Sequence, residues 1–164
     1  FRPSSRIFSK SLGGGSVFDL GCYPISFFML FAKNPEKISF ISKSLTYAKS
    51  NVDDDAKAVL NYNNEFDCKI HVSIKNDLDN VCIIKGTKGS LKINEPWNPE
   101  INSSIEVTNN KHFYIKSINS KLSTFTNQIE KVSESFISQE NNPNLFNIEK
   151  SLINMKIIND WLKK

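Results

Sequence analysis

GGGSVFDLGCYP, at residues 13–24, is the stretch that most restricts the fold. Its three glycines end an irregular segment, and the apolar run that follows predicts one helix over residues 16–33. Asn34 and Pro35 are expected to end that helix, because the residue before a proline disfavours the helical conformation. A helix that is apolar on nearly every side packs between layers of a domain. It is also too short and too interrupted for a membrane span, which needs about 20 residues with few or no charges.

Farther along the chain, the hydrophobic pattern has the period of strands and then of helices. Residues 56–62 and 66–74 alternate between apolar and polar on either side of a turn, which predicts an antiparallel hairpin. Two more strand pairs are expected at 81–84 with 91–93 and at 105–107 with 113–115, followed by helices over 122–136 and 148–162 with Asn147 as N-cap of the second. This order predicts a single α+β domain over residues 1–164, with an antiparallel or mixed open sheet and helices packed on one face.

Composition narrows the class of protein. The 21 Lys and Arg residues exceed the 17 acidic residues only slightly and are spread along the chain, which argues against a nucleic-acid partner. A content of 39% hydrophobic and 23% charged residues is typical of a soluble globular protein. Three cysteines without a CxxC motif exclude a disulfide framework and a thiolate zinc site. With no secretory leader and no membrane segment visible, we expect a cytoplasmic protein. The first residue is Phe rather than Met, which suggests a piece of a longer chain.

Asp19 and Tyr23 are the first candidates for chemistry. They are four residues apart and therefore share one face of the predicted helix. A phenol oriented by a neighbouring carboxylate can act as a general acid or base. A carboxylate also disfavours ionisation of a phenol, whose reference pKa is about 10, so a cation must be supplied from elsewhere. The alternative is that Asp19 caps a helix beginning near Leu20 and that Tyr23 is an ordinary core residue.

Glycines and one tryptophan are the other candidates for binding. The glycine run ahead of a helix could present N–H groups to an anion, which makes Gly14 and Gly15 candidate cofactor contacts. The alternative is that these glycines allow close packing. Trp97, between Pro96 and Pro99, is either a hydrophobic plug or a wall of a ligand pocket.

A metal site is not expected. Asp53, Asp54 and Asp55 are interpreted as a solvated loop entering a strand, because consecutive carboxylates of an extended chain do not point the same way. Neither His71 nor His112 has a companion at the spacing of metal ligands. The segment 86–90 is expected to be a tight turn, since it lacks the spacing of a phosphate-binding loop.

The quoted stretch resembles GGG-x-x-x-D-x-G-x-[HY], the signature that opens the second domain of the Gfo/Idh/MocA oxidoreductases. The likeness continues, in the same order, through later segments and spans most of the chain. These segments are Pro35-Glu36-Lys37-Ile38, Val52-Asp53-Asp54, Gly86-Thr87-Lys88-Gly89, residues 94–99 and the helix at 152–162. Within the family, the chain is most similar to the branch with dihydrodiol dehydrogenases and glucose–fructose oxidoreductase, in which Tyr ends the signature.

This resemblance implies the second domain of an NAD- or NADP-dependent oxidoreductase acting on a sugar, polyol or dihydrodiol. Tyr23 would then be the acid/base group or its partner, Asp19 would position the substrate or the phenol, and Trp97 would contact the substrate. The family also commonly pairs subunits through the open face of this sheet.

Two motifs of the family are absent from the chain: the dinucleotide-binding glycine fingerprint and a Glu-Lys-Pro motif whose Lys is the usual cation beside the acid/base. Both belong to an N-terminal Rossmann domain, which would be a further partner and would bind most of the cofactor. We therefore expect the chain alone to be half an active site and inactive. The alternative function is a non-catalytic dimerisation or interaction domain derived from the same fold.

Overall fold

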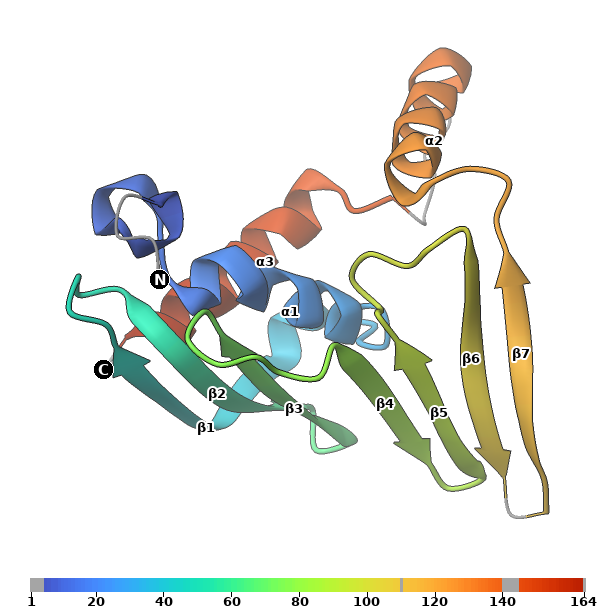
Figure 1. Cartoon of the computed structure of the whole chain (residues 1–164), viewed down its shortest axis with the longest axis horizontal. Coiled ribbons are helices and arrows are strands. Elements are labelled where there is room, and N and C mark those ends of the chain that lie inside the picture. Colours follow the sequence, from blue (N-terminus) through green and yellow to red (C-terminus); the bar gives the residue numbers. More distant parts are fainter. Residues whose placement is uncertain (1–4, 110, 140–144, 164) are drawn as a thin grey trace. The chain divides into compact units, whose positions relative to one another are not determined.

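The computed structural model describes residues 5–109, 111–139 and 145–163, and Figure 1 shows its elements. The α-helices are α1 (Cys22–Met29), α2 (Thr124–Ser138) and α3 (Ile148–Leu162). The strands are β1 (Ile38–Tyr47), β2 (Asp53–Tyr62), β3 (Phe66–Ser73), β4 (Val81–Gly86), β5 (Gly89–Asn94), β6 (Asn102–Asn109) and β7 (Phe113–Asn119). Among the described helices, none has both the length and the apolar content needed to cross a lipid bilayer.

The chain divides into two compact units. The first, Phe1–Leu78 with Phe146–Lys164, contains the antiparallel sheet β1-β2-β3 together with α1 and α3. The second, Asp79–Leu145, contains the antiparallel sheet β4-β5-β6-β7 and α2. The α+β class and the three predicted hairpins are confirmed, because β2 pairs with β3, β4 with β5 and β6 with β7. The predicted single domain thus consists of two units, each with its own open sheet.

In the first unit, α1 and α3 cover one face of the sheet (Figure 1). Alternation along β2 turns Ala56, Ala58, Leu60 and Tyr62 toward these helices, and all four are buried. Trp161 of α3 is fully buried at the centre, and its indole Nε1 donates a hydrogen bond to the Lys57 carbonyl at 3.2 Å. The polar end of a large core side chain is thereby satisfied.

The first helix differs in length and burial from the one predicted. Residues Val17–Gly21 form a π-helical turn, and α1 then ends at Met29 rather than beside Asn34. At Gly21, an added Cβ would lie 3.2 Å from Trp161 Cζ3, so the missing side chain lets the helix pack against α3. The helix is not enclosed on all sides, since Tyr23 remains 49% exposed.

The three aspartates are not the solvated loop that was expected. They open β2, and Asp53 and Asp54 are buried. Thr46 Oγ1 donates to Asp54 Oδ1 at 2.6 Å, and Asp55 Oδ2 lies 3.0 Å from His71 Nε2. The prediction was wrong because buried donors, supplied by tertiary structure, make carboxylates tolerable inside a sheet.

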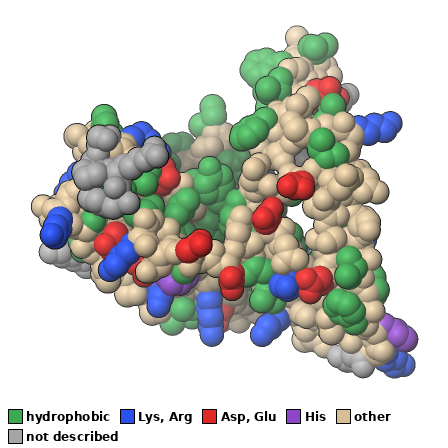
Figure 2. All heavy atoms as spheres, viewed as in Figure 1, with side chains coloured by type: hydrophobic (Ala, Val, Ile, Leu, Met, Phe, Trp, Pro, Cys, Tyr) green, Lys and Arg blue, Asp and Glu red, His purple; other side chains and the backbone are tan. Residues whose placement is uncertain are grey.

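The second unit confirms the helical period predicted for α2. Ser123 is its N-cap, with the hydroxyl accepting from the Thr126 N–H at 3.3 Å. None of the residues of α2, all of which the structure describes, is buried, and Figure 2 shows hydrophobic side chains gathered over this helix.

In the first unit, the predicted cap of α3 is also confirmed, as Asn147 Oδ1 accepts from the Lys150 N–H at 2.9 Å.

Candidate functional site

The glycine run passes between two groups that leave no room for side chains. On one side, an added Cβ at Gly14 would lie 2.5 Å from the Ile7 carbonyl oxygen. On the other, a Cβ at Gly15 would overlap the Asp53 carboxylate, and the φ of Gly15, +119°, is one that other residues rarely adopt. The alternative of close packing therefore accounts for both glycines.

The N–H groups of these glycines are already used within the chain. Gly13 donates to the Lys10 carbonyl at 3.2 Å, Gly14 to Ser9 at 2.9 Å and Gly15 to Ile7 at 2.9 Å. A cofactor that approaches Gly14 or Gly15 would thus meet their Cα and carbonyl atoms rather than free donors.

Asp53 supplies the negative charge at the start of the first helix. Its Oδ2 accepts from Ser16 Oγ and from the Val17 N–H, both at 2.7 Å, and its side chain is buried. A carboxylate at this position satisfies an orphan N–H group and interacts favourably with the helix dipole. Asp53 therefore anchors the turn that carries Asp19, a role that the sequence analysis missed.

Asp19 pairs with Arg6. Its Oδ1 contacts Arg6 Nη2, and the side chains are 26% and 54% exposed, respectively. Asp19 lies within the π-helical turn, not ahead of it, so the alternative that it is an N-cap is wrong. Arg6 belongs to the 3-10 turn Arg6–Phe8, where no sequence signal distinguished it. It compensates the charge of Asp19 and is not the cation expected beside the Tyr23 phenol, which the resemblance assigns to the Lys of a Glu-Lys-Pro motif outside this chain.

Tyr23 follows four residues after Asp19, in the first turn of α1. The residue is 49% exposed, so the alternative that it is an ordinary core residue is wrong. Between them, burial raises the pKa of the Cys22 thiol, and the Asp19 charge adds to this effect. Both effects disfavour the thiolate of Cys22, which is the reactive form of a cysteine.

Trp97, the third candidate, belongs to the second unit, whereas Asp19 and Tyr23 belong to the first. It lies between β5 and β6 and is partly buried. Nearby, the predicted turn between β4 and β5 is confirmed, and a Cβ at Gly89 would overlap the Thr108 carbonyl.

In the described residues, no group of three or more His, Cys, Asp or Glu side chains could hold a metal ion.

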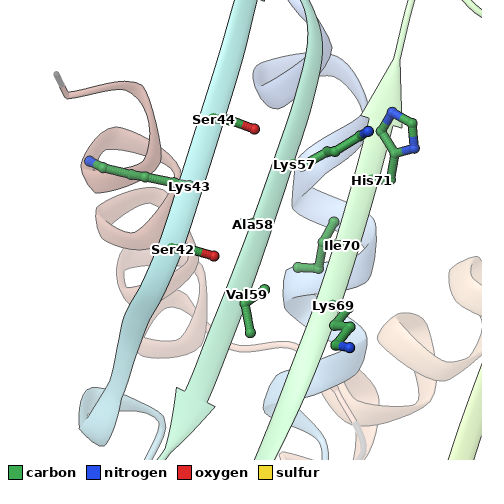
Figure 3. A pocket seen from close by; sticks show the side chains of 9 residues that line it. All are labelled: Ser42, Lys43, Ser44, Lys57, Ala58, Val59, Lys69, Ile70 and His71. Carbon is green, nitrogen blue, oxygen red and sulfur yellow. The ribbon is translucent and has the colours of Figure 1, made fainter.

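The face of the β1-β2-β3 sheet turned away from the helices carries a shallow hollow (Figure 3). Lys57 and His71 are paired residues on the adjacent strands β2 and β3, and their side chains lie next to one another in it. Lys57, Val59, Lys69 and His71 alternate with the buried residues of the same strands, so they point to the uncovered side. The family resemblance assigned subunit pairing to the open face of a single sheet and did not distinguish between the two sheets of this structure.

Comparisons with known proteins match the first half of the chain most clearly. The sequence model described as GFO/IDH/MocA C-terminal domain matches residues 1–92, which include the glycine run, Asp19 and Tyr23. Trans-1,2-dihydrobenzene-1,2-diol dehydrogenase of Mus musculus is 35% identical over 88 residues, 52% of this chain and 26% of that protein. The Xenopus tropicalis enzyme of the same name is 30% identical over 95 residues, 57% of this chain and 28% of that protein.

Solved structures match nearly the whole chain. A 3-ketoreductase from Actinomadura kijaniata, in complex with NADP and TDP-benzene, has a TM-score of 0.82 and 18% identity over 96% of this chain. An aldose-aldose oxidoreductase from Caulobacter crescentus, complexed with glycerol, has a TM-score of 0.83 and 15% identity over 98% of this chain. At these identities the likeness shows the fold alone. This chain spans 48% of each of those two chains.

Proposed function

This chain belongs to the GFO/IDH/MocA C-terminal domain family, and from that premise we propose that it is the substrate-facing domain of a nicotinamide-dependent oxidoreductase. The observation that carries the proposal is the Asp19–Tyr23 pair, held on an accessible helical face within the matched region. We propose a sugar, polyol or dihydrodiol as substrate. The dihydrodiol dehydrogenases that match about half of this chain support this class.

In this proposal, Tyr23 and Asp19 handle the polar end of the substrate. For reduction of a carbonyl, the Tyr23 phenol donates its proton to the substrate oxygen as the carbon accepts a hydride, and the alcohol is formed. Asp19 accepts a hydrogen bond from a neighbouring substrate hydroxyl and holds it beside the phenol. Trp97 would contact the apolar part of the substrate.

The cofactor is proposed to be NAD or NADP, which would exchange the hydride with the substrate carbon. The 3-ketoreductase with a similar fold binds NADP. The sequence lacks GxGxxG, and the N–H groups of Gly13, Gly14 and Gly15 are used internally, so the glycine run does not form a phosphate cradle. An N-terminal Rossmann domain of the intact protein would therefore bind most of the dinucleotide, with Gly14 and Gly15 lying against it through Cα and carbonyl atoms. We expect no metal requirement and no nucleic-acid or membrane partner.

We also propose that two subunits pair through the uncovered face of the β1-β2-β3 sheet, where polar and apolar side chains such as Lys57 and Val59 are presented together. A cytoplasmic location fits the cysteine content, which is three residues without a CxxC motif or a disulfide framework of paired positions. The alternative function, a non-catalytic interaction domain, would pair through the same sheet. Asp19 and Tyr23 would then have no catalytic role.

The test compares this chain with the intact protein. The reading frame upstream of Phe1 is expected to encode GxGxxG and Glu-Lys-Pro, and the intact protein to reduce NADP or NAD with a dihydrodiol or an aldose. The 164-residue chain alone should neither turn over nor bind NADPH tightly in isothermal calorimetry. A reading frame that begins at Phe1, or an intact protein without nicotinamide-linked activity, would favour the interaction domain instead.

A further inference from the structure

Arg6 is a charged residue of the site that the proposed mechanism does not use. It comes from the segment ahead of the glycine run, yet its guanidinium contacts Asp19, 13 residues later in the chain. Asp19 lies in a helical turn whose neighbours Val17 and Gly21 are buried. A carboxylate beside such residues has few other sources of charge compensation.

The backbone of Arg6 is held in place by the glycine run. An added Cβ on Gly14 would lie 2.7 Å from the Arg6 carbonyl oxygen, so only glycine allows the two segments to approach this closely. The Ile7 carbonyl accepts from the Gly15 N–H at 2.9 Å, and the Arg6 carbonyl accepts from the Ser9 N–H at 2.9 Å. The guanidinium therefore reaches Asp19 from a fixed base rather than from a free end.

The pair is partly exposed, with 54% of the Arg6 side chain and 26% of the Asp19 side chain accessible to solvent. Its contribution to stability is therefore reduced by solvent screening, although Asp19 is more enclosed than a surface carboxylate. The same exposure leaves the carboxylate accessible to a small molecule, one helical turn from the half-exposed Tyr23. Charge compensation at such a point bears on the ligand more than on the fold.

We propose that Arg6 is a positioning residue for Asp19. The inference rests on the proposed function and deepens it. The guanidinium holds Oδ1, so that Oδ2 faces a substrate hydroxyl in one orientation, and it offsets the carboxylate charge that would otherwise oppose a developing tyrosinate at Tyr23. Arg6 touches neither substrate nor cofactor in this scheme and acts through Asp19.

The experiment is a double-mutant cycle in the intact protein, with R6Q, D19N and the R6Q/D19N pair. R6Q is expected to lower kcat/KM for the diol or sugar about tenfold or more, with the KM for NADPH unchanged. R6Q should have no further effect once D19N is present, because its effect passes through that carboxylate. R6K, which keeps the charge, should recover most of the loss.

Lys10 supplies the matched control, since it is another exposed cation of the same segment and K10Q removes the same charge. A kcat/KM for R6Q equal to that of K10Q, or a full R6Q loss on top of D19N, would overturn the role of Arg6. The melting temperature of R6Q should stay close to that of K10Q. If R6Q is poorly folded, R6M, which keeps the apolar stem of the side chain and removes its charge, takes the place of R6Q in the cycle. An intact wild-type protein without nicotinamide-linked turnover would refute the proposed function and this inference together, whereas an active wild type with an unaffected R6Q refutes the inference alone.

Discussion

The carboxylate of Asp53 occupies the space that a Cβ atom on Gly15 would need. The same carboxylate accepts hydrogen bonds from Ser16 Oγ and the Val17 N–H, so it fixes the first helical turn immediately after the glycine. Gly15 and Asp53 thus belong to one arrangement: the missing side chain admits the carboxylate, and the carboxylate sets the position of the helix that carries Asp19 and Tyr23.

Gly15→Ala should destabilise this chain strongly. Alanine would overlap the Asp53 carboxylate and would be strained at a φ of +119°, and we expect a loss of about 2–4 kcal/mol in the free energy of unfolding. Urea denaturation followed by circular dichroism measures it. Gly13→Ala is the control, since Gly13 has a φ of +68° but nothing within 4 Å of an added Cβ. Equal losses in the two variants would show that close packing at Asp53 does not matter.

Asp53→Asn tests the anchoring of the helix start. The amide keeps the shape of the side chain but loses the charge that strengthens the two hydrogen bonds at the helix N-terminus, at a cost of about 1–3 kcal/mol. The free energy of unfolding in urea checks this. Asp67→Asn, at an exposed aspartate bonded to Asn61 Nδ2 at 2.7 Å, should cost much less, and a similar cost for the two variants would contradict the role given to Asp53.

The hairpins and the later helices could be predicted because their patterns are local. Strand alternation across residues 66–74 and the spacing of apolar residues in α2 depend on neighbours along the chain. The N-cap at Asn147 is equally local. The end of α1 at Met29 was missed because apolar residues continue to Ala32, and nothing in the sequence marked the exposed side of the helix.

The site was only half predictable for the same reason. The four-residue spacing of Asp19 and Tyr23 is visible in the sequence, but their supports come from distant segments. Arg6 lies in a stretch without periodicity, and Asp53 sits in an acidic triplet that resembles a surface loop. Only the tertiary structure shows that one aspartate of this triplet is buried beneath the glycine run.

The pH dependence of stability should carry a contribution from Asp55. Burial opposes ionisation, but hydrogen bonds from His71, Asn76 and Ser73 outweigh it and lower the pKa of Asp55 below its ordinary value of 3.8. A carboxyl whose folded pKa is lowered stabilises the fold above the unfolded value and loses that stabilisation as the pH falls through the folded one. The difference in unfolding free energy between wild type and Asp55→Asn should therefore shrink as the pH falls below about 4. A difference that stays constant or grows below that pH would contradict this assignment.

Tyr23→Phe is the sharpest test of the chemistry, because it removes one oxygen atom from the accessible face of α1. If the Tyr23 phenol transfers the proton, turnover in the intact protein should fall by about 10²-fold or more. Binding of NADPH should change little, because in the proposed arrangement the N-terminal domain would hold the dinucleotide. Tyr47→Phe is the matched control: Tyr47 is also 49% exposed and belongs to the same unit, but it lies at the end of β1. Steady-state kinetics of both variants measure the effect, and their melting temperatures confirm that they are folded. Wild-type turnover in Tyr23→Phe would remove this residue from the mechanism. The fold and the family of the chain would not be affected by that result.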